Sequence, residues 1–486
     1  MSIKLVNVGD FEAENHYYPR ALNAQIHSLI TFFLNLDNER IINRYCHFYP
    51  NVDPNVLRSI LNYKAKHFRW SGADLFHVTT GKGNRRMILI ETNSCPSGQK
   101  SMPLLVSSQE HGGYHELLTK TFIPLYLKRK KTLPKGSLAV IYDKNDMEAW
   151  GYACTLADAT QEKVYLVKFE DDKESYDKIK FENGILLIND EEKWRPIKAA
   201  FRYVTQRPWN RIPIFTKTFI FNPIIACLSG GRNKLVASKA YEFLNAELEG
   251  TGLEIRTPET IQDLSIEAIP LWVERMGGSA VIKNPYSNAG QGVWTITNQQ
   301  ELDEFMKLDH RYDKFIVQSL IGAPNWSSKG KMGLYYHVGT VPNKKNEIFV
   351  ADIRMMVHNT ANGFRPLAIY ARRAHNPLPQ NLDPDMSSWS ILGTNLSIKN
   401  TDGKWDSETN RLLLMDQRDF NKLGIGLDEL IEGYIQTVLA TVAIDKMSQK
   451  LLPSPGTFDK NLFLSLNPDE SLLKEIEMAT KIPESP

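Results

Sequence analysis

Residues 72–93 read GADLFHVTTGKGNRRMILIETN, and this stretch decides how the fold of the whole chain is interpreted. The Gly-Lys-Gly at 81–83 predicts a turn between two strands. If the turn is centred just after its lysine, Asp74 lies directly opposite Glu91 and both side chains point to one face of the hairpin. Asn93 shares that face, because side chains alternate along a strand. The stretch therefore predicts one patch of three oxygen-bearing side chains.

This oxygen-rich patch has two interpretations. Two carboxylates that close repel each other unless a cation neutralises them, and oxygen ligands suit Mg²⁺. Asp74, Glu91 and Asn93 are therefore candidate metal ligands. The alternative is three polar side chains at an exposed strand end, although the apolar run at 87–90 favours burial. A register shift of one residue would move Asp74 to the other face.

Length and composition predict several domains and exclude some classes of protein. At roughly 100–200 residues per domain, 486 residues correspond to about three units. The chain has 58 basic and 56 acidic residues, so no strong field favours nucleic acid or an anionic membrane as a partner. No apolar run reaches the roughly 18 residues of a membrane span.

The cysteines and the N-terminus predict a cytoplasmic protein. The four cysteines are widely separated and form no C-x-x-C pair, which argues against a zinc site or a disulfide framework. Widely spaced thiols fit a reducing compartment. The polar, acidic stretch MSIKLVNVGDFEAE is not typical of a signal peptide.

Hydrophobic periodicity divides the chain further. Residues 1–70 have apolar positions at mostly helical spacing. From 137 to 209, short apolar strands alternate with a helical stretch, which is typical of a small α/β unit with a parallel sheet. A helix is expected at 231–250, and a long helix with an apolar stripe at 424–450.

A second motif is VIKNPYSNAGQGVW at 281–294, a strand that delivers Lys283 into a Gly-containing loop. Glycines let backbone N–H groups approach and surround phosphate oxygens, and a lysine adds positive charge. The loop is neither a P-loop nor a G-x-G-x-x-G fingerprint. Its alternative interpretation is an ordinary β-hairpin turn. The candidate phosphate-binding residues of the loop are Asn288, Gly290, Gln291 and Gly292.

Two arginine-bearing segments form the third motif. VADIRMMV at 350–357 and AIYARRAH at 368–375 are predicted to be neighbouring strands of an antiparallel sheet. Asp352 and Arg354 share one face of the first strand, and the second strand carries Arg372 and Arg373. Arginine forms bidentate contacts with phosphate or carboxylate. The alternative is a structural Asp–Arg ladder.

The order of these motifs resembles that of the ATP-grasp ligases. GRNKLVASKAYEFL looks like the helix with the first ATP lysine, Lys234, and VIKNPYSNAGQGVW looks like the strand and flap with the second, Lys283. FIVQSLI looks like the hinge strand that holds adenine, with Gln318 and Leu320 as binding residues. DIRMMV, ARRA and TNLS are similar to the DIR, RR and N of the glutamate ligases that modify a ribosomal protein.

The hairpin at 72–93 precedes the lysines, whereas the corresponding metal-binding strands come last in those ligases. This order resembles the circularly permuted members, such as eukaryotic glutathione synthetase and glutathionylspermidine synthetase. The resemblance implies a multidomain α/β fold in which two α+β subdomains grip ATP beside a small parallel-sheet domain. The implied domains are helices with metal strands at 1–130, the small α/β domain at 131–230, the nucleotide-binding subdomain with its flap at 231–322, and the core sheet, lid and C-terminal helix at 323–486.

The resemblance also implies a reaction. A carboxylate–amine ligase uses ATP to make an acyl phosphate, and an amine then forms the amide, with release of ADP and phosphate. Mg²⁺ on the oxygen-rich patch would bridge the nucleotide phosphates, Lys234 and Lys283 would bind them, and Arg354 and Arg373 would hold the γ-phosphate. The segment 324–346 and the flap are candidate lids. The implied substrates are amino acids or small peptides, and a homodimer is expected by analogy.

Two departures and three alternatives accompany this resemblance. Ser319 follows Gln318 where many relatives have Glu, and Ser287 stands where the glutathione synthetase loop carries a further metal-binding Glu. No motif specifies the acid or the amine.

The alternative functions are a kinase-type phosphotransferase on the same fold, a non-catalytic nucleotide-binding protein, and an unrelated multidomain protein with a chance order of motifs.

Overall fold

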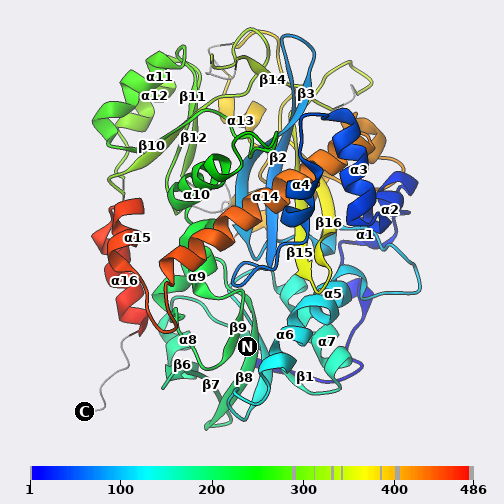
Figure 1. The fold of residues 1–486 in the computed structure, drawn as a ribbon, viewed down its shortest axis with the longest axis vertical. Helices are drawn as coiled ribbons and strands as arrows, with labels where there is room; N and C mark the ends of the chain where they lie inside the picture. The colour runs from blue at the N-terminus through cyan, green and yellow to red at the C-terminus, as the bar shows by residue number, and fades with distance from the viewer. Residues whose placement is uncertain are drawn as a thin grey trace.

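The structure is a computed structural model with three larger β-sheets, which Figure 1 shows together with the helices that cover them. The residues that it describes are 3–286, 292–310, 312–329, 333–340, 343–383, 386–399 and 405–480. No helix within these ranges is long and apolar enough to cross a membrane. All four cysteines are free thiols, as their spacing predicts.

The first sheet is the predicted α/β unit, but it is mixed rather than purely parallel. Its order is β1-β5-β4-β8-β7-β6, with β9 beside β8. β4, β5, β8 and β9 are parallel, whereas β1, β6 and β7 pair in antiparallel fashion. The strands are β1 (Ile3–Val6), β4 (Ser137–Tyr142), β5 (Val164–Lys168), β6 (Ile179–Glu182), β7 (Ile185–Asp190), β8 (Lys193–Tyr203) and β9 (Phe219–Phe221).

The N-terminal strand β1 lies outside the region in which sequence periodicity predicts this sheet. It pairs with β5, so a segment from the predicted helical region completes the edge of the α/β unit. Two helices belong to the same unit, α7 (Asp146–Thr160) and α8 (Lys173–Lys178). α7 is almost wholly buried along one side and packs against β4 and β5.

The second, core sheet joins two hairpins that are far apart in the sequence. β2 pairs with β3 on one side and with β15 on the other, and β15 pairs with β16. The adjacent antiparallel strands predicted near 350–375 are thereby confirmed. The strands are β2 (Trp70–Thr80), β3 (Arg85–Ser94), β14 (Tyr335–His337), β15 (Ala351–Thr360), β16 (Gly363–Arg373) and β19 (Leu412–Leu413).

The hairpin of β2 and β3 has the predicted pairing with a different turn. Asp74 lies opposite Glu91, as predicted. The turn, however, is centred on Lys82 itself, because Thr79 pairs with Arg85. Leu75 then pairs with Leu89, so one extra residue of β3 forms a bulge that restores the expected register at Glu91.

One long helix, α14 (Leu427–Leu451), crosses the back of the core sheet, as Figure 1 shows. It approaches closely at Gly433, where a Cβ atom would lie 3.1 Å from Leu75 Cδ1. Its buried leucines and isoleucines each contribute about 1.5–3 kcal/mol of burial free energy. The helix predicted at 424–450 is confirmed, and it holds the sheet rigid behind the pocket.

The third sheet has four antiparallel strands in the order β10-β13-β11-β12. They are β10 (Thr260–Leu264), β11 (Ala280–Lys283), β12 (Val293–Ile296) and β13 (Phe315–Ser319). The helices α11 (Ile269–Arg275) and α12 (Gln299–Met306) cover the sheet and share a separate hydrophobic core with it. α10 (Lys234–Glu247) lies between this sheet and α14.

The remaining elements are short. Asp53 caps α4 by accepting hydrogen bonds from the N–H groups of Asn55 and Val56. The helices are α1 (Pro19–Leu22), α2 (Ser28–Asn35), α3 (Asn38–Phe48), α4 (Pro54–Leu61), α5 (Gly112–Leu117), α6 (Ile123–Arg129), α9 (Ile224–Ala226), α13 (Ser388–Leu392), α15 (Lys460–Leu466) and α16 (Glu470–Thr480). β17 (Ser397–Lys399) and β18 (Trp405–Ser407) form a small ribbon.

Candidate active site

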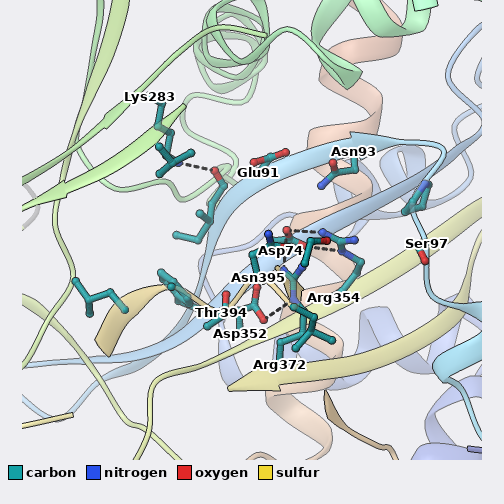
Figure 2. A pocket seen from close by; sticks show the side chains of 18 of the residues that line it. Asp74, Glu91, Asn93, Ser97, Lys283, Asp352, Arg354, Arg372, Thr394 and Asn395 are labelled. Carbon is teal, nitrogen blue, oxygen red and sulfur yellow. Dashed lines mark hydrogen bonds and ion pairs between the residues drawn. The ribbon is translucent and has the colours of Figure 1, made fainter. Parts of the chain in front are cut away.

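A pocket of about 270 Å³ lies where the three sheets meet. Its floor is the face of the core sheet that carries Asp74, Glu91 and Arg354 (Figure 2). Lys283 approaches from the third sheet, and the loops after β3 and β4 close the opposite end. Most of the residues that sequence analysis singles out line this single pocket.

The floor carries four charged side chains that we call the arginine–aspartate ladder: Asp74, Asp352, Arg354 and Arg372. Arg354 lies opposite Asp74 and Arg372 lies opposite Asp352, so strand pairing alone brings the charges together. Arg354 Nε and Nη2 donate to the two Asp74 carboxylate oxygens at 2.6 and 2.7 Å. Arg372 bridges both aspartates.

The charges of the ladder stabilise each other. Burial disfavours the charged form of Asp74, but the guanidinium groups of Arg354 and Arg372 outweigh it and hold the pKa of this carboxyl well below its ordinary value. Burial likewise disfavours the charged form of Arg354, and the neighbouring Asp74 outweighs it and raises that pKa. The structural Asp–Arg ladder that the sequence allowed as an alternative is thus present, and it lines the pocket.

The ladder changes the expected role of Asp74. Both of its oxygens accept hydrogen bonds from arginine, so Asp74 positions the guanidinium groups, and its predicted role as a metal ligand stays a prediction. Glu91 and Asn93 face the pocket from the same strand and fit a hard cation better, because Mg²⁺ needs only one or two protein ligands when phosphates and water complete its shell. Within the described ranges, no three His, Cys, Asp or Glu side chains form a metal-binding group.

Two lysines form the other end of the pocket. Lys234 begins α10 behind its cap Asn233, and Lys283 ends β11. Lys234 Nζ lies 3.8 Å from a Glu91 oxygen, and Lys283 Nζ donates to the Ile90 carbonyl at 3.3 Å.

Keeping these two buried lysines in their charged form costs free energy. Burial, together with the nearby Lys234 charge, lowers the pKa of Lys283 to about 8, although Glu91 opposes the shift. Burial also lowers the pKa of Lys234. A bound anion would relieve this cost, because an opposite charge favours the protonated lysine.

The hinge residues Gln318 and Leu320 both line the pocket. Gln318 Nε2 donates to Thr260 Oγ1 at 2.8 Å. The Leu320 N–H donates to Ser328 Oγ at 2.7 Å, and the Leu320 carbonyl accepts from the Ser328 N–H at 2.9 Å. An adenine contact through the Leu320 backbone would therefore have to displace Ser328.

The Gly-rich loop is described only at its ends. Asn288, Gly290 and Gln291 lie outside the described residues. Gly292 is described, and its carbonyl accepts a hydrogen bond from the Asn284 N–H at 2.8 Å, which closes the base of the loop. Its φ of +65° is a conformation that favours glycine.

Arg373 is the predicted residue that the structure places elsewhere. It is not among the described residues that line the pocket, and its guanidinium carbon lies 4.5 Å from the centre of the Phe349 ring. Its neighbour Arg372 points into the pocket instead, because side chains alternate along β16. Register across the hairpin could have identified Arg372, since Asp352 lies directly opposite it.

Sequence reasoning missed a second set of pocket residues, Lys100, Lys144 and Arg232. Lys100 and Lys144 lie in short connecting segments outside the motifs, and Arg232 lies in the motif of Lys234 but was not singled out. One signal was present for Lys144: it follows the strand β4 of a parallel sheet, and ligands bind at the carboxyl ends of such strands.

Comparisons with known proteins give a likeness in fold only. No family model matches the chain, and no curated protein matches it. Solved structures that resemble it include a glutathione synthetase-like effector from Globodera pallida, at 10% identity over 72% of this chain and 86% of that one, with a TM-score of 0.39. Another is D-alanyl-alanine synthetase A from Vibrio cholerae, at 11% identity over 54% and 94%, with a TM-score of 0.28.

A RimK domain ATP-grasp protein from Sphaerobacter thermophilus is also similar, at 12% identity over 48% of this chain and 90% of that one, with a TM-score of 0.27. The chain is therefore a mixed α/β protein with several sheets that resembles ATP-grasp enzymes. Because these TM-scores are all below 0.5, the argument for function rests on the pocket. The circular permutation and the four domain boundaries stay predictions.

Proposed function

We propose that this protein is an ATP-dependent ligase that joins a carboxylate to an amine through an acyl phosphate and releases ADP and phosphate. The observation that carries the proposal is the arrangement of charge in one pocket. Two buried lysines beside Glu91 line the same pocket as an arginine–aspartate ladder in which the arginines are fixed by ion pairs. Phosphoryl transfer needs this kind of preorganised positive charge.

The lysine end is the proposed nucleotide site. Lys234 and Lys283 would bind the α- and β-phosphates, and Gln318 and Leu320 would lie beside the base. Glu91 and Asn93 are the residues that would hold Mg²⁺ with the phosphates. A bound Mg²⁺ would neutralise charge that develops on the transferring phosphoryl group.

The ladder end is the proposed site of the acid. A carboxylate oxygen of the substrate attacks the γ-phosphorus, the bond to the β-phosphate oxygen breaks, and ADP leaves. Arg354 and Arg372 would stabilise the charge on the phosphoryl oxygens, and Asp74 would keep both guanidinium groups in position. In this proposal Arg372 takes the role that the resemblance gave to Arg373.

In the second step an amine attacks the acyl carbon, phosphate leaves, and the nitrogen loses a proton to form the amide. An acyl phosphate hydrolyses if water reaches it, so the site has to be closed during this step. Residues of all three sheets line the pocket, and this arrangement supports such exclusion of water.

The experiment incubates the purified protein with Mg-ATP and pools of amino acids, small peptides and amines, and measures ADP, AMP, phosphate and amide. We expect ADP and phosphate in equal amounts with the amide, lost in Glu91→Ala and Lys283→Ala. A phosphorylated product without amide would indicate a kinase-type reaction. Release of AMP and pyrophosphate would contradict the acyl phosphate, and nucleotide binding without turnover would indicate a non-catalytic protein.

For an acid found in this way, ¹⁸O in the substrate carboxylate gives a direct readout of the intermediate. One labelled oxygen is expected in each phosphate released, because the carboxylate oxygen forms the bond to phosphorus. Unlabelled phosphate would mean that no acyl phosphate forms.

A further inference from the structure

The pocket continues past the ladder to an end that the nucleotide site does not use. This end lies between the core sheet and the α/β sheet, at the carboxyl ends of the parallel strands β4 and β8. Lys144 and Asn145 follow β4, and Thr205 follows β8. Crevices at the carboxyl ends of parallel strands are common positions for ligands.

Three cations from separate elements form what we call the basic wall of this end: Lys100, Lys144 and Arg232. Lys100 Nζ lies 3.4 Å from Asn145 Oδ1, and Arg232 donates to the Ser94 carbonyl at 2.6 Å. The positive charges of Arg232, Arg354 and Lys100 all act on Lys144. The three side chains therefore converge although they are far apart in the sequence.

The basic wall is built into the fold. Glu148, which is fully buried in α7, accepts hydrogen bonds from Ser97 Oγ at 2.6 Å and from the Gly98 and Gln99 N–H groups at 2.8 Å. This fixes the loop that carries Lys100 against the helix that follows Lys144. The arrangement is thus preformed.

The nearby carboxylate of Asp143 favours the charged form of Lys144, but the ion pair that Asp143 forms is with Arg211. Burial and the neighbouring cations lower its pKa to about 8. Asp143, next to it in the chain, accepts hydrogen bonds from the N–H groups of Thr205 and Gln206 and forms an ion pair with Arg211. An anion at this end would supply a further opposite charge.

A count of charges leads to the same conclusion. Among the described residues that line the pocket are seven lysines and arginines but only three aspartates and glutamates. The Mg²⁺ complex of ATP carries about two negative charges, which leaves part of the positive excess for another ligand. A simple monocarboxylate supplies only one further charge.

We propose that the basic wall binds a second anionic group of the acid substrate, so that the ligase acts on small acids that carry a further carboxylate or phosphate. This inference rests on the proposed function and names its substrate class. The second anionic group would lie against Lys100 and Lys144, and the reacting carboxylate would lie against Arg354. Acids that lack the second group would leave the buried cations unpaired.

The experiment uses the full chain with Mg-ATP and hydroxylamine as a general amine, so that any acyl phosphate appears as a hydroxamate. Matched acids differ only in one group: alanine, serine, aspartate and O-phosphoserine, each also within a glycine dipeptide. Aspartate or O-phosphoserine compounds are expected to give hydroxamate at low KM, and comparison of the two separates carboxylate from phosphate. Alanine and serine compounds are expected to react poorly.

Variants locate the effect. Lys144→Gln and Lys100→Gln are expected to raise KM for the anionic acid roughly tenfold to a hundredfold, with KM for ATP unchanged. Lys144→Arg keeps the charge and is expected to retain most binding. Lys163→Gln is the matched control, because Lys163 is exposed in the loop before β5. The proposal is overturned if neutral acids react as well as anionic ones, or if Lys144→Gln leaves KM for the acid unchanged.

A calorimetric titration of the same acids without nucleotide separates this inference from the proposed function. Binding of aspartate or O-phosphoserine compounds that Lys144→Gln abolishes would support the basic wall even in a protein that does not turn over ATP. Turnover of ATP with no preference for anionic acids would leave the ligase intact and contradict the basic wall. If neither the wild type nor Lys144→Gln bound any of the acids, the proposed role of the basic wall would also be contradicted.

Discussion

The two ends of the pocket hold positive charge in opposite ways. In the arginine–aspartate ladder, Arg354 and Arg372 form ion pairs with aspartates, and burial does not prevent both from staying charged. At the other end, the contact of Lys234 with Glu91 is long, at 3.8 Å, and burial lowers the pKa of both lysines. Two aspartates balance the arginines of the ladder, whereas the two lysines share the charge of Glu91, and a bound anion would add a further opposite charge.

This difference distinguishes residues that hold other side chains in position from residues that bind a ligand. A carboxylate with both oxygens on arginine contributes mainly by holding the guanidinium groups in place. A buried lysine with a depressed pKa is a better indicator of a ligand, although such shifts also occur in structural clusters. The predictions below test this division, from the largest expected effect to the smallest.

Asp74→Asn is expected to give the largest change, a loss of about 3–5 kcal/mol in the free energy of unfolding, because it leaves buried arginine charge uncompensated. Urea unfolding measures it. Glu91→Gln is the comparison: its partly exposed side chain and long ion pair predict a loss below about 1 kcal/mol, with a higher Mg²⁺ requirement instead. A small loss in Asp74→Asn with a raised Mg²⁺ requirement would restore Asp74 as a metal ligand.

Lys283→Met is expected to reduce ATP turnover by roughly a hundredfold to a thousandfold, because it removes one preorganised charge from the phosphates. Its melting temperature should not fall, since the variant removes a buried charge that costs free energy. ADP release and thermal unfolding check both parts. Lys307→Met, at an exposed position of the same region, is the control and should change neither. Turnover equal to that of the control would exclude Lys283 from the site.

Nucleotide affinity is expected to fall as pH rises above about 8, by up to about tenfold per pH unit, because Lys283 loses its proton in the free protein. The nucleotide phosphates are already ionised above about pH 7.5 and do not add to this change. The pKa of Lys283 is lower in the folded than in the unfolded chain. Lys283 therefore stabilises the folded state increasingly as pH rises from about 8 to 10.5, the ordinary lysine pKa. Calorimetry between pH 7.5 and 9.5 checks the affinity, and a flat profile would contradict the assignment.

Arg373→Gln is expected to have the smallest effect, less than about threefold in turnover, because Arg373 does not line the pocket and its contacts are an aromatic one worth about 0.5–1 kcal/mol and a long hydrogen bond to the Ala374 carbonyl. Arg372→Gln should be far more damaging, since Arg372 bridges both aspartates. Steady-state kinetics of the two variants show which of the two adjacent arginines contributes to turnover. A greater loss in Arg373→Gln would mean that the register of β16 differs from that described.

Local pattern predicts much of the fold. The alternation of side chains and the Gly-Lys-Gly turn were enough to place Asp74 opposite Glu91. This pairing is nevertheless right because two deviations cancel: the turn is centred on Lys82 rather than after it, and Ile90 forms a bulge. No sequence rule specifies either deviation. The helix at the back of the core sheet was predictable from its apolar stripe. β1 was missed because four residues joining a distant sheet leave almost no local signal.

The site was predictable where motifs lie on regular elements and unpredictable where loops converge. Lys283 and Arg354 were singled out from strand patterns, and Lys234 came from the resemblance to the ATP-grasp ligases. The choice of Arg372 over Arg373 needed the register of a whole hairpin. The basic wall needed the packing of two sheets, because Lys100, Lys144 and Arg232 meet only through tertiary structure.

A calorimetric titration with Mg-ATP shows whether the lysine end of the pocket binds the nucleotide. The wild type, Lys283→Met and Arg373→Gln are titrated at pH 7.5. We expect saturable binding to one site in the wild type and in Arg373→Gln, and loss of binding in Lys283→Met. Absence of binding to the wild type, or undiminished binding to Lys283→Met, would contradict it.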